Sequence, residues 1–134
     1  MSYWLAIAGV LSSGFVLLHV VGGGADVHAP LLTARLAGEL QAYVSVLWHG
    51  FTVSMVLCSG LLLIATWHRG TRKVLTLVTV VQYVGFAGVF LFYGWVRFDS
   101  VLVMPQWIGF LAIVLVALVG LWRDPQVSFR QVQV

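Results

Sequence analysis

The chain contains few charged residues and a single cysteine. Asp, Glu, Lys and Arg together make up 8% of its 134 residues, against about 25% in soluble domains. The only thiol, at Cys58, leaves no partner for an intrachain disulfide, and no CxxC pair is present to form a redox or zinc motif. Hydrophobic residues account for 61% of the chain, and its mean hydropathy is +1.04. These values predict an integral membrane protein and exclude an ordinary soluble domain.

The length and the charge balance limit the architecture and the partners. A chain of 134 residues can build one helical bundle but hardly a second domain. We therefore expect a single transmembrane domain over residues 1–134. The net charge is +3, but the basic residues are scattered through short loops and form no continuous stripe of the kind that binds nucleic acid. The expected partner is the lipid bilayer.

Four apolar stretches are long enough to cross a membrane, which takes about 20 residues in a helix. They cover about residues 3–21, 43–67, 74–96 and 103–122, and a polar tail follows at 123–134. No basic region precedes the first stretch and no clear cleavage site follows it, so we expect a retained helix and not a signal peptide. The predicted fold is an all-α, antiparallel bundle of four transmembrane helices.

A glycine-rich stretch follows the first span. Three consecutive glycines, Gly22 to Gly24, predict the end of the first helix, because glycine is costly inside helices and favours turns. We expect residues 25–29 to form a loop and Pro30 to start a short amphipathic helix carrying Leu31, Leu32, Leu36 and Leu40 on one face. The first outer loop should therefore be longer than the others.

The distribution of Lys and Arg predicts the orientation. Membrane proteins concentrate basic residues in their cytoplasmic loops. One side of the predicted bundle holds five of them, and the opposite side holds only Arg35 and Arg97. The five are Arg69, Arg72, Lys73, Arg123 and Arg130. We expect both termini in the cytoplasm, the first loop outside, and the inner membrane of a bacterium as the location.

Polar and ionisable groups gather around that first loop. Ionisable side chains within or beside a membrane helix are costly and usually functional. On the second span Ser45, His49, Thr52 and Ser59 fall on one stripe. His19 and His49 lie at similar depths, so they could converge between the first two helices. The predicted cluster at the outer side consists of His19, Asp26, His28, Glu39 and His49.

The leading hypothesis is a transition-metal site. His19, His28 and His49 would be ligands, and Asp26 and Glu39 would be either ligands or partners that fix the imidazole tautomers. Copper, iron and zinc all suit this set. The spacing H-x8-H-x20-H matches no compact metal motif. Such a site could serve redox chemistry, metal handling or the assembly of a larger oxidase.

A haem site is the second hypothesis. A b-type haem needs two axial histidines on facing helices, which His19 and His49 would supply. Gly14, Gly50 or Gly88 would make room for the ring. Arg97 or Arg35 would pair with a propionate, and the protein would transfer electrons.

Two functions without a bound cofactor are also compatible with the sequence. The chain could be a non-catalytic accessory subunit of a larger membrane complex, or a homo-oligomer, because its fourth span has no ionisable residue and looks suited to packing. It could also act on a lipid or quinone, with His49 as base and Asp26 or Glu39 as its orienter. No spacing singles out a catalytic residue. Simple solvation of Asp26 and His28, and a surface pair between Arg35 and Glu39, explain part of the cluster without any function.

Overall fold

The computed structural model describes residues 1–123, which are helical apart from short connections. The elements are α1 (Tyr3–Leu18), the π-helix η1 (His19–His28), α2 (Ala29–Thr33), α3 (Gly38–Trp67), α4 (Arg72–Phe98) and α5 (Gln106–Arg123). The predicted tail lies outside the described residues except for Arg123. Four helical segments are long and apolar enough to cross a membrane: Tyr3–Thr33, Gly38–Trp67, Arg72–Phe98 and Gln106–Arg123. The prediction of an all-helical chain with four such helices, which suggests an integral membrane protein, is confirmed.

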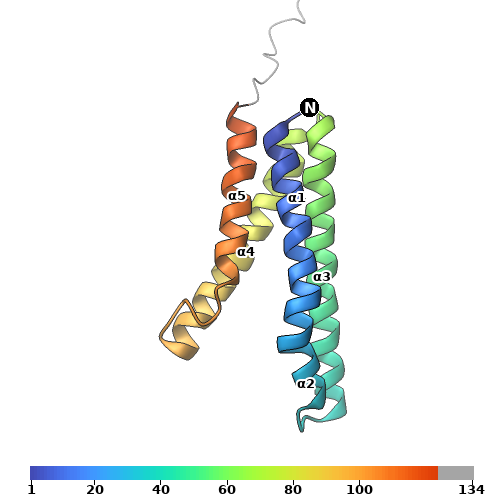
Figure 1. Ribbon diagram of the computed structural model, residues 1–134, viewed down its shortest axis with the longest axis vertical. Coiled ribbons are helices and arrows are strands. Elements are labelled where there is room, and N and C mark those ends of the chain that lie inside the picture. The colour runs from blue at the N-terminus through green and yellow to red at the C-terminus, as the bar shows by residue number, and fades with distance from the viewer. Residues whose placement is uncertain (124–134) are drawn as a thin grey trace, which may run out of the picture.

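The helices form two arms that meet at one end (Figure 1). One arm is the rod of α1, η1 and α2 packed along α3, and the other is α4 packed along α5. Near the N-terminus α1 also packs against α5, and α3 against α4, so that all four helices join. Towards the opposite end the arms diverge (Figure 1). We call residues 2–12, 55–66, 72–87 and 110–120 the closed half, and residues 13–54 and 88–109 the open half.

The closed half contains nearly all of the buried side chains. Its core is made of residues from all four long helices, and small residues let these helices approach closely. A Cβ atom at Gly9 would lie 2.6 Å from Cδ2 of Leu63, and one at Gly120 would lie 3.0 Å from Cδ2 of Leu5. The buried hydrophobic residues are Leu5, Ala8, Met55, Cys58, Leu62, Ala65, Tyr83, Ala87, Phe110, Ile113, Val114 and Ala117.

Several polar groups inside the closed half bond to one another or to backbone carbonyls, although the buried Thr76 hydroxyl has no hydrogen-bond partner among residues 1–123. The Ser12 hydroxyl bonds to that of Ser59 at 2.6 Å and also to that of Tyr83. Ser59 in turn donates to the Met55 carbonyl at 2.9 Å. Such pairing is needed because hydrocarbon offers these groups no partner. Arg72 is buried as well: its Nε donates to the Ala65 carbonyl and its Nη2 to the Thr66 carbonyl, at 2.8 and 2.9 Å. It therefore closes the C-terminal end of α3.

The prediction that Gly22 to Gly24 end the first helix is wrong. The chain continues through them as η1 and α2, and the reversal lies at residues 34–37, within the stretch predicted to be one amphipathic helix. No glycine of residues 1–123 adopts a positive φ. The glycines are used for close approach: a Cβ at Gly23 would lie 3.0 Å from the indole of Trp48 on α3. Packing between helices outweighs the local helix-breaking tendency here.

Candidate functional site

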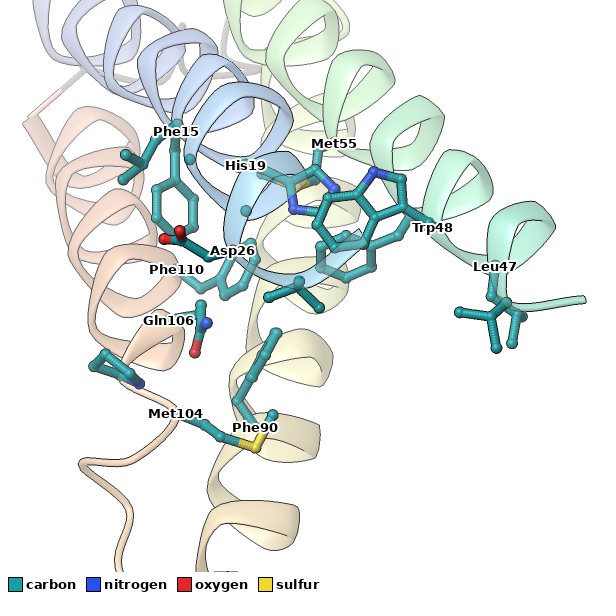
Figure 2. A pocket seen from close by; sticks show the side chains of 17 residues that line it. Phe15, His19, Asp26, Leu47, Trp48, Met55, Phe90, Met104, Gln106 and Phe110 are labelled. Carbon is teal, nitrogen blue, oxygen red and sulfur yellow. The ribbon is translucent and has the colours of Figure 1, made fainter. Parts of the chain in front are cut away.

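The divergence of the arms leaves a cavity of about 640 Å³ in the open half. α1, η1 and α3 form one wall, and α4, α5 and the residues just before α5 form the other (Figure 2). Ligand-binding cavities commonly measure about 300–1,000 Å³ and have apolar walls with few polar groups. This cavity fits that description, because its polar lining side chains, among residues 1–123, are His19, Asp26 and Gln106.

Aromatic rings cover the bottom of the cavity, where it meets the closed half. Phe110 of α5 packs edge-on against Phe15 of α1, with ring centroids 4.9 Å apart. Its centroid lies 6.1 Å from that of Phe51 and 6.0 Å from that of Phe90. Beneath it lies Tyr83, at 5.3 Å, which joins the buried hydroxyl cluster. The cavity therefore ends on a rigid aromatic surface contributed by all four long helices.

The π-helix η1 determines which side chains face α3. Its hydrogen bonds reach one residue further along the chain than those of an α-helix. Each turn therefore holds about one residue more than the turn of an α-helix, which holds about 3.6 residues. The nine positions from His19 to His28 then make about two full turns, so the two imidazoles lie on the same face. In an α-helix the same nine positions would make about two and a half turns and put the two imidazoles on opposite faces. Both imidazoles accordingly contact Trp48. Stretches of π-helix are rare and often mark functional sites.

Trp48 is the centre of a group of stacked rings. His19 stacks on it with centroids 4.1 Å apart, and His28 with centroids 5.3 Å apart and planes within 8° of parallel. His49 then meets His28 edge to face at 5.4 Å. The three predicted histidines therefore form a chain of contacts that runs from His19 through Trp48 and His28 to His49, with His19 and His49 at its two ends.

Hydrogen bonds orient two of these imidazoles. Thr52 donates its only hydroxyl proton to the Trp48 carbonyl at 2.9 Å. The same hydroxyl oxygen lies 3.1 Å from Nε2 of His19, and this contact holds the imidazole against α3. Nε2 of His28 pairs with the Ser45 hydroxyl at 3.3 Å.

The other predicted site residues are more dispersed. Asp26 is on η1 and lines the cavity, while Glu39 lies exposed in the first turn of α3. Arg97 is exposed at the end of α4, and neither it nor His49 lines the cavity as residues 1–123 form it. Within these residues no group of three or more His, Cys, Asp or Glu side chains is placed to hold a metal ion. The predicted five-residue set is therefore not gathered at one point.

Several cavity residues were not singled out from the sequence. The fourth span seemed suited to packing alone, yet its first residue, Gln106, supplies a polar group, and Met104, Pro105 and Phe110 complete that wall. Gln106 directly follows a proline at the start of an apolar run, and this is the one signal that could have marked it.

Comparison of the chain with models of known protein families, with characterised proteins and with solved structures gives no match.

Proposed function

We propose that this protein is an integral membrane protein that binds a hydrophobic small molecule, taken up from the bilayer, in the cavity between its two arms. The observation that carries the proposal is the cavity itself, which combines a volume of about 640 Å³ with walls of Phe, Leu, Val, Met and Trp. A molecule dissolved in lipid gains shape-specific contacts with these rings, and the few polar groups fix its orientation.

The position of the cavity suits such uptake. It lies at the end of the bundle opposite the basic turn between α3 and α4 (Figure 1). By the distribution of Lys and Arg, that end would face the outer side of the membrane. Side chains of the open half such as Leu47 and Val27 are 71% and 47% exposed in the isolated chain. Lipid or a ligand would cover them.

Photolabelling with benzophenone tests this proposal. Benzophenone is neutral, aromatic and lipid-soluble, and under ultraviolet light it inserts into nearby C–H bonds. We expect adducts at Met104, which lines the cavity and is partly exposed. The variant Val44→Trp should fill the cavity and abolish these adducts. The matched variant Val46→Trp, on an exposed position of α3 outside the lining, should retain them.

Labelling that does not depend on the cavity would contradict the proposal. Adducts spread over the lipid-facing side chains of all four helices, and unchanged by Val44→Trp, would show that the cavity binds nothing preferentially. Peptide mapping by mass spectrometry distinguishes the two outcomes.

A further inference from the structure

The charge on the cavity lining points to a class of ligand, and this step rests on the proposed function. Asp26 is the only charged residue that lines the cavity in residues 1–123. Neither Arg35 nor Arg97 belongs to the lining, and within the described part of the chain no hydrogen bond or ion pair engages the Asp26 carboxylate. The cavity therefore presents a negative charge that the described residues leave uncompensated.

The depth of Asp26 places this charge near the edge of the hydrocarbon. Asp26 lies 23 positions after Tyr3 in one continuous helical segment, which corresponds to about 35 Å along the helix axis. The hydrocarbon layer itself is about 30 Å thick. The carboxylate thus lies near the interface, and in Figure 2 it is drawn on the same side of the cavity as Phe15, Phe110 and Gln106. A ligand that combines a polar group with an apolar body matches this lining.

The other polar groups of the lining are compatible with a donor. A carboxylate accepts hydrogen bonds, and a neutral imidazole such as that of His19 has one accepting nitrogen. Gln106 can serve either role. An ammonium or amine head supplies both a positive charge and N–H donors, whereas a carboxylate or phosphate head would be repelled.

The apolar walls also favour a cation. The faces of aromatic rings carry negative partial charge and attract cations within about 6 Å. Phe15, Phe51, Phe90 and Phe110 all line the cavity. We propose that the cavity binds lipophilic cations, with Asp26 as their counter-ion and the four phenylalanine rings around their apolar body.

Two ions of the same shape and opposite charge test this directly. Tetraphenylphosphonium and tetraphenylborate both carry four phenyl rings around one central atom. Titration calorimetry on the purified full chain in detergent at low ionic strength should give an affinity at least about tenfold higher for the phosphonium, because the carboxylate attracts the cation and repels the anion. This comparison needs no variant, so a folding defect cannot affect it.

Variants then assign the preference to one carboxylate. Asp26→Asn should lower phosphonium affinity by at least about tenfold and remove the difference between the ions, and Asp26→Glu should preserve it. Glu39→Gln makes the same change of charge at an exposed position outside the lining, and it should bind like the wild type. Benzophenone adducts at Met104 in Asp26→Asn would verify that its cavity is intact.

Equal affinity for the two ions, no binding of either, or phosphonium binding that Asp26→Asn leaves unchanged would each overturn the cation proposal. If benzophenone still labels the cavity in that case, the proposed function stands with a neutral ligand. If the Met104 adducts are absent too, the proposed function fails with it.

Discussion

The closed and open halves are built from the same four long helices, yet they bury their side chains to very different degrees. In the closed half Leu62 of α3 is 0% exposed, and in the open half Leu47 of the same helix is 71% exposed. Hydropathy does not separate these two positions, because both are leucines in one apolar run. The difference comes from the partners that face them: α1, α4 and α5 converge around the first and diverge around the second (Figure 1).

This difference indicates a division of roles between the halves. The closed half has close contacts at glycines and hydrogen bonds that join the hydroxyls of Ser12, Ser59 and Tyr83, and together these hold the helices in place. The open half places its aromatic and polar side chains on the walls of a cavity. Sites work best when rigid elements support them. The closed half would supply that support, and the open half would be free to bind.

The largest expected effect comes from shortening a leucine in each half. Leu62→Ala should destabilise the protein by about 2–5 kcal/mol, because it leaves a void in the packed core. Leu47→Ala should change stability by less than about 0.5 kcal/mol, since its side chain is mostly exposed. Unfolding by SDS titration in mixed micelles measures both. Equal losses would mean that the open half is packed as tightly as the closed half.

A smaller effect is expected from adding side chains at glycines of α1. Gly9→Val should cost about 1–3 kcal/mol by overpacking, since even a Cβ there would meet Leu63 at 2.6 Å. Gly14 lies five positions further along α1, and a Cβ atom there would have no neighbouring heavy atom within 4 Å. The free energy of unfolding of Gly14→Val should therefore stay within about 0.5 kcal/mol of the wild-type value. The same unfolding assay applies. A destabilised Gly14→Val would place a packing contact where the arms are thought to diverge.

Hydropathy alone was sufficient to predict the helical class. Four long runs of apolar residues require helices, and the polar stretch from His68 to Thr71 separates α3 from α4 close to the predicted place. The error at Gly22 to Gly24 has a physical origin. Glycine weakens a helix locally, but at Gly23 the missing side chain admits Trp48, a residue 25 positions away. Such a contact cannot be read from neighbouring residues.

The candidate site was predicted only in part for a related reason. His19 and His28 both stack on Trp48, and His49 contacts His28. The convergence of all three imidazoles on one bound ligand stays a prediction. The cavity could not be foreseen. Phe90 and Phe110 are apolar residues in apolar spans, and only the angle between the arms turns them into cavity walls.

The smallest effect is expected at His49, and it bears on the metal and haem hypotheses, which remain predictions from the sequence. Its imidazole is exposed and touches the ring of His28, so His49→Ala should alter stability by less than about 0.5 kcal/mol.

Elemental analysis and an absorption spectrum of the purified wild type and variant test the two hypotheses together. A bound haem gives an intense Soret band, whereas a lone metal ion does not. Metal or haem that is fully retained in His49→Ala would exclude this residue as a ligand. Loss of either, at unchanged stability, would instead assign the group of rings around Trp48 a cofactor separate from the ligand of the cavity.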